Sequence, residues 1–180
     1  GIPVHAVGPG VGRNLQNHAA LFVGASLKPG SRQSPTLNTH PTACMRLSSP
    51  EPGAPGSDVY INIQSKTSWN AMGYRLASLN AVLLKPQGSG EVRIVAPDAT
   101  TAPRVDFRFD AHDGDMQRLS YGLLEITRIL ASPHVAPHLG KPFVVRMNDR
   151  IRKWNALAQG NVVGGGERHM GARRLGITEI

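Results

Sequence analysis

The 180-residue chain has a single cysteine, few aromatic side chains and no long apolar run. The lone Cys44 excludes an internal disulfide framework and suits a reducing compartment, so a cytoplasmic location is expected. No stretch approaches the ~20 apolar residues of a membrane-spanning helix, and no signal peptide is recognisable, so no membrane span is expected. Aromatic residues make up only 5% of the chain, so its core must consist mainly of leucine, valine, isoleucine and alanine.

The overall composition is that of a globular protein. Hydrophobic residues account for 40% of the chain and charged residues for 18%, and the length suffices for one sizeable core. One domain is the default expectation. With 20 glycines and 14 prolines, loops should take a large share of the chain.

The net charge of +8 is concentrated at one end. Residues 1–140 carry 12 Lys/Arg against 9 Asp/Glu, whereas residues 141–180 carry 8 against 3. No zinc-finger spacing, RNA-binding aromatic motif or helix-turn-helix pattern accompanies the basic tail, so nucleic acid is not an expected partner. We interpret the tail as a solvated helix face with a frayed end. The alternative is a surface that meets an acidic partner or another part of the same protein.

Several short strands are predicted in the first 110 residues. Apolar and polar residues alternate over Asp58–Gln64, which predicts a half-buried strand whose polar face carries Tyr60, Asn62 and Gln64. Residues 29–56 are rich in proline, serine, threonine and glycine, which predicts a loop. Further strands are expected over residues 20–23, 79–85, 91–95 and 104–109, with a hairpin joining 79–85 to 91–95.

One long helix is predicted after the strands. Apolar residues recur at spacings of three and four from Met116 to Leu130, Asp113 or Asp115 can cap the start, and Pro133 closes the helix. A weaker helix is predicted from Asp149 to about Gln159. The combination indicates an α+β fold, in which a largely antiparallel sheet carries one long helix on one face. The opposite, polar face would be open to a ligand or to another domain.

Searches for cofactor, metal and hydrolase motifs identify no complete site. The glycine-rich segments 10–15 and 164–169 both lack the third glycine of a dinucleotide-binding fingerprint. The seven histidines are scattered, and prolines flank the closest pair, His134 and His138, so no metal site is expected. No G-x-S-x-G nucleophile motif is present. These motifs alone therefore identify no catalytic residue in this chain.

A family resemblance starts from the glycine run. Pro9–His18 resembles the PGVGRNLQDH segment of the glucose–methanol–choline (GMC) flavoprotein oxidoreductases. Residues 83–94 are similar to that family's LLRP…SRGxVRL stretch. Other segments that follow the family's order and spacing are Gly1–Val4, Pro97–Asp98, Ala102–Phe109, Asp115–Met116 and Ser132–Pro133. Together these segments are distributed along residues 1–135, and their shared order makes the set specific.

The resemblance implies a division of the chain into three parts. Residues 1–18 would lead out of a missing FAD domain, 19–145 would form the substrate-binding domain, and 146–180 would be a basic helix or loop tail with partial disorder. Enzymes of this family oxidise an alcohol by passing hydride to FAD while a histidine takes the hydroxyl proton. Their FAD fingerprint and catalytic histidine motif have no counterpart here. No FAD is therefore expected to bind this fragment, and the isolated chain is expected to be inactive.

The resemblance also assigns candidate residues. Within the family the chain resembles the choline and alcohol dehydrogenase branch, although choline-oxidising relatives carry a histidine about where Leu84 or Lys85 stands. The residues expected to line the pocket for a small alcohol are Tyr60, Asn62 and Gln64. The residues expected at the domain seam near the cofactor are Gly10, Gly12, Asn14, Gln16 and His18. The alternative function is a non-catalytic binding module whose basic tail contacts an acidic partner or nucleic acid.

Overall fold

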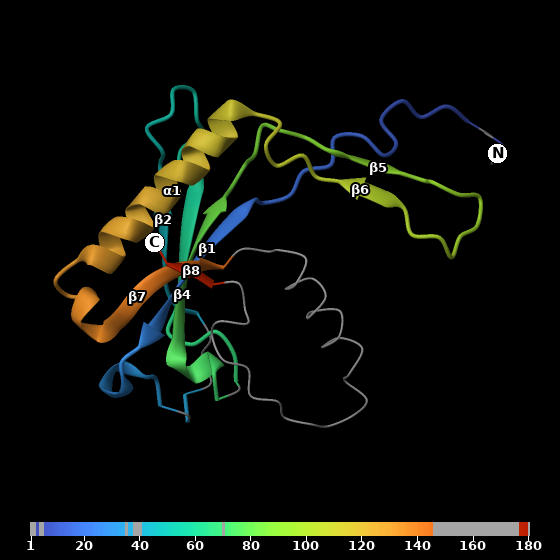
Figure 1. Cartoon of the computed structure of the whole chain (residues 1–180). Coiled ribbons are helices and arrows are strands. Elements are labelled where there is room, and N and C mark those ends of the chain that lie inside the picture. The colour runs from blue at the N-terminus through green and yellow to red at the C-terminus, as the bar shows by residue number, and fades with distance from the viewer. Residues whose placement is uncertain are drawn as a thin grey trace. The chain divides into compact units, whose positions relative to one another are not determined.

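The computed structural model describes residues 3, 6–34, 36–37, 41–69, 71–145 and 177–179. Within these residues the chain forms a six-stranded sheet of order β2-β3-β4-β1-β7-β8, a separate β5–β6 pair and one α-helix (Figure 1). The β1–β7, β7–β8 and β5–β6 pairs are antiparallel. The expected α+β class is thus confirmed. The elements are β1 Ala20–Leu27, β2 Pro41–Leu47, β3 Val59–Gln64, β4 Leu76–Leu83, β5 Glu91–Arg93, β6 Arg104–Asp106, α1 Asp113–Ala131, β7 Leu139–Val145 and β8 Ile177–Glu179.

The contacts within the chain divide it into two compact units, and strands β1, β2, β3 and β4 and helix α1 each contribute residues to both. Unit 1 consists of Gly1–Leu21, Met45–Ile61 and Ala81–Glu125. Unit 2 consists of Phe22–Cys44, Asn62–Asn80 and Ile126–Ile180. Each unit is described by itself.

In unit 1 the apolar stripe of α1 packs on β3 and β4. The predicted stripe is confirmed, because Leu119 is buried and the helix approaches the sheet closely at Gly122. A Cβ atom on Gly122 would lie 2.9 Å from Val59 Cγ1 and 3.0 Å from Ala81 Cβ, so only glycine allows this approach. Val59 and Ala81 are fully buried beneath the helix. The predicted alternation of β3 is therefore observed, with its apolar side under α1.

Unit 1 also contains a ribbon that we call the arm, made of residues 6–15 and 90–106. Val92 N–H donates to the carbonyl of Gly12 at 2.7 Å, and Leu15 and Gly90 exchange two backbone hydrogen bonds of 2.8 and 3.1 Å. The glycine run therefore extends the β5–β6 pair along the free edge of β5 (Figure 1).

The predicted hairpin between residues 79–85 and 91–95 is wrong. Strand β4 joins the large sheet, whereas β5 pairs with β6. The physical reason lies at Lys85, whose left-handed φ of 52° ends the extended run after β4. Gly90 is in turn held by Leu15 rather than by β4.

Unit 2 contributes the other half of the large sheet. Strands β1 and β7 pair through Val23↔Val144 and Gly24↔Phe143, and the register shifts between Ala25 and Leu27. Beyond them β7 pairs with β8, with Val144 opposite Thr178. Val23 and Ala25 are almost fully buried, so this strand adds to the core.

Three strands lie where the sequence predicted none. Strand β2 lies in the segment predicted as loop, β7 was not predicted, and β8 lies in the tail predicted as helix and loop. Strand β2 stands at one end of the sheet, and residues 43–46 are exposed, so they show no amphipathic alternation. The helix predicted over residues 149–159 lies outside the described residues.

Candidate functional site

The polar face of β3 and β4 is the first candidate region. Because α1 covers Val59 of β3 and Ala81 of β4, the residues at alternate positions lie on the opposite face of these neighbouring strands. In unit 2 that face carries Asn62 and Gln64 from β3, and Ser78 and Asn80 from β4. The polar set predicted from alternation therefore continues onto the adjacent strand.

Two buried oxygens near the end of β3 lack hydrogen-bond partners among the described residues. They are the side-chain carbonyl oxygen Oδ1 of Asn62 and the hydroxyl oxygen Oγ of Ser65. By contrast, the hydroxyl of Ser78 donates to Oδ1 of Asn80 at 2.6 Å, and both residues are buried. A buried acceptor left unpaired costs ~1–3 kcal/mol, so such an oxygen is suited to accept a hydrogen bond from a ligand or water.

A buried cation follows β3 in unit 2. Lys66 is fully buried and donates from Nζ to the carbonyl of Leu37. The same Nζ lies 3.9 Å from the centroid of the Trp69 ring and 5.1 Å from that of Tyr74. No carboxylate forms a salt bridge with Lys66 in the described part of the chain. Cation–π attraction to the two rings therefore supports the ammonium and holds the segment after β3.

A buried ion-pair network in unit 1 connects α1 with the residue before β3 and with the two residues after β4. Arg118 donates from Nε to Asp58 Oδ2 at 2.7 Å and from Nη1 to Asp115 Oδ1 at 2.9 Å. Its Nη2 donates to the carbonyls of Leu84 and Lys85 at 2.7 and 3.2 Å. Arg118, Asp58 and Asp115 are each at most 1% exposed, so one guanidinium is enclosed between two carboxylates.

The pKa of Asp58 is lowered from its ordinary value. Burial alone raises it, but hydrogen bonds from the side chain and backbone N–H of Ser49 and from Arg118 together outweigh burial. The Ser49 hydroxyl and N–H lie 2.6 and 2.7 Å from the Asp58 carboxylate. The ionised form is thereby favoured.

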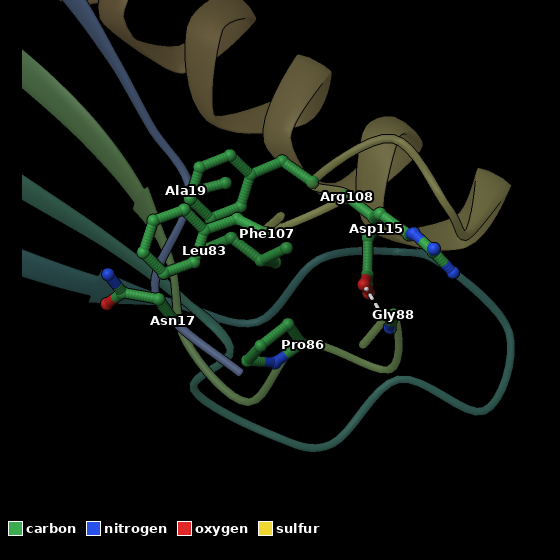
Figure 2. Close-up of a pocket in the computed structure, with 9 residues that line it drawn as sticks. Asn17, Ala19, Leu83, Pro86, Gly88, Phe107, Arg108 and Asp115 are labelled. Atoms are coloured by element: carbon green, nitrogen blue, oxygen red, sulfur yellow. Dashed lines mark hydrogen bonds between the residues drawn. The ribbon is translucent and has the colours of Figure 1, made fainter. Parts of the chain in front are cut away.

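Asp115 holds the turn after β4 instead of capping its own helix. Its Oδ2 accepts from the backbone N–H groups of Gln87 and Gly88 at 2.9 and 2.8 Å, as Figure 2 shows for Gly88. The sequence-based assignment of Asp115 as a possible cap is therefore wrong. The pocket beside it, lined by Ala19, Leu83 and Phe107 among others, has a volume of only ≈ 10 Å³ (Figure 2). Ligand pockets typically need ~300 Å³ or more, so it is not a substrate site.

Of the seam candidates, Gln16 contacts the turn that Asp115 holds, whereas Gly12 and Asn14 lie beside β5. Gln16 donates from Nε2 to the carbonyl of Pro86 at 3.0 Å, and Gly12 accepts from Val92. Asn14 has a left-handed φ of 57° and lines the hollow described next. Gly10 and His18 are exposed. The structure thus places Gln16 at this turn and both Gly12 and Asn14 beside β5, and Tyr60, Asn62 and Gln64 belong to β3.

An open hollow of ≈ 450 Å³ lies between the glycine run and β5. Arg13, Arg93 and Arg108 line it together with Glu91. The carboxylate of Glu91 pairs with both Arg93 and Arg108 at 2.8 Å, which offsets part of the positive charge of the hollow.

The described residues do not fit the diphosphate of FAD. Such groups bind at a helix N-terminus that follows a glycine turn, where free N–H groups and the helix dipole favour an anion. Here extended backbone follows the glycine run, and Asp113 and Asp115 occupy the first turn of α1. Two carboxylates at that helix end would repel a diphosphate.

Comparison with known proteins decides the family. Residues 86–178, more than half of the chain, match the family model described as GMC oxidoreductase. The chain belongs to the GMC oxidoreductase family. It is 32% identical over 142 residues to the 5-(hydroxymethyl)furfural oxidase of Methylovorus sp. (strain MP688), a match that covers 77% of this chain and 26% of that protein. The GMC chain therefore spans about a quarter of this curated relative.

The structural comparison supports the fold. A crystal structure of pyridoxine 4-oxidase from Mesorbium loti matches with a TM-score of 0.54 over 73% of this chain and 28% of that chain, at 18% sequence identity. The GMC fold expected from the glycine run and the downstream segments is thus confirmed. Among the described residues, no helix is long and apolar enough to cross a membrane, and no cluster of three potential metal ligands occurs.

The sequence did not predict the buried ion-pair network around Arg118 or the buried ammonium group of Lys66. Asp115 and Arg118 fall on the helix face that includes Leu119 and Gly122, and charged residues at apolar-stripe positions were the available signal. Lys66 gave a weaker signal, because the approach of Trp69 and Tyr74 to its ammonium depends on the fold of the loop.

Proposed function

We propose that the whole protein is an FAD-dependent oxidoreductase of the choline and alcohol dehydrogenase type, which oxidises the CH–OH group of a small alcohol. This chain would be its substrate-binding part and would be inactive alone. The observation that carries the proposal is the GMC family match over residues 86–178. FAD, when bound to the whole protein, would supply the hydride acceptor.

The polar face of the sheet supports a role in binding the alcohol. In this proposal the hydroxyl of the substrate donates to Oδ1 of Asn62, which is buried and has no partner among the described residues. Gln64, two residues after Asn62 on the same side of β3, would line the same pocket. The relative from Methylovorus is named for oxidation of a hydroxymethyl compound, which supports a primary alcohol as the substrate class.

The cofactor would be held by a part of the protein outside this chain. The two carboxylates in the first turn of α1 and the extended backbone after the glycine run support this division. This chain would then shape the alcohol site and exclude water from it, and it would not bind the diphosphate.

The test compares this chain with the protein encoded by the whole open reading frame. We expect the whole protein to purify with FAD and the 180-residue chain to show no stoichiometric binding when titrated with FAD. A whole protein that contains no flavin and cannot be loaded with it would overturn the proposal. Tight one-to-one binding of FAD by this chain would refute the proposal that another part of the protein holds the cofactor.

The basic tail favours a second candidate function, a non-catalytic module that contacts an acidic partner or nucleic acid. Residues 141–180 carry five more positive than negative charges. This function predicts salt-sensitive DNA binding with a Kd of about 1 μM or tighter at physiological salt, tighter than a non-specific contact. Binding that is absent at physiological salt would exclude the nucleic-acid form of this alternative.

A further inference from the structure

The ammonium group of Lys66 in unit 2 is enclosed and held in one place. Lys66 is 0% exposed, and its Nζ donates to the carbonyl of Leu37. The loop that contains it is closed tightly on itself. Thr67 N–H donates to the carbonyl of Gly73 at 3.0 Å, and a Cβ on Gly73 would lie only 2.5 Å from Ser68. The positive charge is therefore a fixed feature of this unit.

Two aromatic rings that are able to bind a cation are occupied by this ammonium. Nζ of Lys66 lies 3.9 Å from the centroid of the Trp69 ring and 5.1 Å from that of Tyr74. Aromatic rings at such distances are the means by which proteins bind quaternary ammonium groups, including that of choline. Because the chain supplies its own cation, these faces of the rings are closed to the ammonium group of a substrate.

No acidic side chain balances the charge of Lys66 among the residues that the structure describes, where every salt bridge belongs to an arginine. Dissolved salt screens a buried charge much less than an exposed one. The electric field of Lys66 therefore acts on its surroundings, and it favours negative charge there.

The polar face of β3 lies within reach of this field. Lys66 follows Gln64 by two residues and Asn62 by four, so its Cα is at most ~15 Å from that of Asn62. Ser65, the residue before Lys66, carries one of the two buried oxygens that lack a partner. At an effective dielectric constant of ~20, a unit charge ~10–20 Å away changes the binding of another unit charge roughly four- to sixteenfold.

We propose that Lys66 sets the charge preference of the alcohol site, so that the substrate is an alcohol without a positive charge. The inference rests on the proposed function, because it takes the alcohol to bind at Asn62. An alcohol with an ammonium group is repelled by Lys66 and finds the rings of Trp69 and Tyr74 occupied. A neutral alcohol is unaffected, and one with a carboxylate is attracted. Lys66 acts at a distance, so it determines specificity and takes no part in the chemical step.

The first test compares choline with 3,3-dimethyl-1-butanol, a neutral alcohol of the same shape, in the flavin-loaded whole protein. We expect kcat/KM to favour the neutral alcohol. Lys66→Met should raise the kcat/KM of choline relative to it roughly four- to sixteenfold. If either alcohol is not oxidised, its Ki against 5-(hydroxymethyl)furfural replaces kcat/KM in the ratio.

Two control variants separate charge from shape. Lys66→Arg retains the positive charge, and Lys28→Met removes an exposed charge from the same unit. Neither should change the ratio between the two alcohols. No shift in Lys66→Met, or equal shifts in Lys66→Met and Lys66→Arg, would overturn the proposal.

A second test needs no substitution. Salt does not screen an enclosed charge effectively, so the preference for the neutral alcohol over choline should persist from about 0.05 to 1 M NaCl. An apolar pocket would reject charge of either sign, whereas Lys66 rejects the cation alone. The alcohol 4-(hydroxymethyl)benzoate should therefore have a KM no higher than that of its methyl ester. A preference that disappears in salt, or a benzoate rejected as strongly as choline, would contradict the role of Lys66.

The outcomes distinguish this inference from its premise. If no alcohol reduces the flavin of the whole protein, the proposed function itself fails. If alcohols reduce it but choline is used as well as 3,3-dimethyl-1-butanol, the proposed function stands and the role assigned to Lys66 is wrong.

Discussion

Arg118 and Asp58 form an ion pair that is closed to solvent, with 2.7 Å between Nε of the arginine and Oδ2 of the carboxylate. Asp58 immediately precedes β3, and Arg118 lies on the second turn of α1. Through the carbonyls of Leu84 and Lys85 the same guanidinium holds the end of β4. The pair therefore fixes the helix, the start of one strand and the turn that leads to the arm.

We expect Arg118→Met to destabilise the protein severely. Without the guanidinium, the carboxylates of Asp58 and Asp115 remain buried and uncompensated, which typically costs ~3–5 kcal/mol of unfolding free energy. Arg93→Met is the matched control, because its ion pair with Glu91 is largely exposed and should contribute below ~1 kcal/mol. Urea denaturation of both variants measures the difference. Equal losses would show that enclosure does not govern the strength of this network.

The lowered pKa of Asp58 predicts acid sensitivity. Its folded-state pKa lies below the ordinary value of 3.8, so its ionised form adds stability above that pH. This stability should be lost as the pH falls through the folded-state pKa. Unfolding free energies measured from pH 6 downward, in unmodified protein and Asp58→Asn, give the test. The variant should be less stable at neutral pH and show a shallower decline in acid. Parallel curves would contradict the assignment.

Two glycines of the glycine run should respond differently to substitution. Gly12 has a φ of 75°, and a Cβ there would lie 2.3 Å from the carbonyl oxygen of Val92, which is backbone and cannot turn aside. Gly12→Ala should therefore cost ~1–3 kcal/mol and detach the run from β5. At Gly10 a Cβ would meet nothing within 4 Å, so Gly10→Ala should be nearly neutral. Thermal denaturation distinguishes them, and equal Tm values would refute the close packing.

If Asn62 binds the substrate hydroxyl, its loss should weaken binding. Asn62→Leu in the whole protein removes one hydrogen bond worth ~0.5–1.5 kcal/mol, so KM for the alcohol should rise about two- to tenfold. Ser120→Ala, on the exposed side of α1, is the control for general effects on folding. Steady-state kinetics at saturating acceptor measures both. An unchanged KM in Asn62→Leu would remove Asn62 from the substrate pocket.

Periodicity predicted the elements that have two distinct faces. The helix around Leu119 and the alternation around Ile61 were found because each buries one face and exposes the other. Strand β2 could not be found in this way, because its described side chains are mostly exposed. The β5–β6 pairing was missed because the left-handed Lys85 redirects the chain, and a lysine gives no sequence signal for that conformation.

In the candidate sites, too, local sequence patterns were predictive and long-range contacts were not. The glycine run revealed the family, because its residue types are specific in order and spacing. Its pairing with β5, through Gly12 and Val92, depends on a long-range contact that no local pattern encodes. Arg118 was likewise hidden, because burial of an arginine depends on the carboxylates that tertiary structure brings to it.

The most direct test of the central claim is anaerobic mixing of the flavin-loaded whole protein with 5-(hydroxymethyl)furfural or another primary alcohol. We expect the visible flavin absorption to bleach while one equivalent of aldehyde forms per flavin. Asn62→Leu should need more alcohol for the same rate. A flavin that no primary or secondary alcohol reduces would contradict the assignment of this chain to an alcohol-oxidising enzyme.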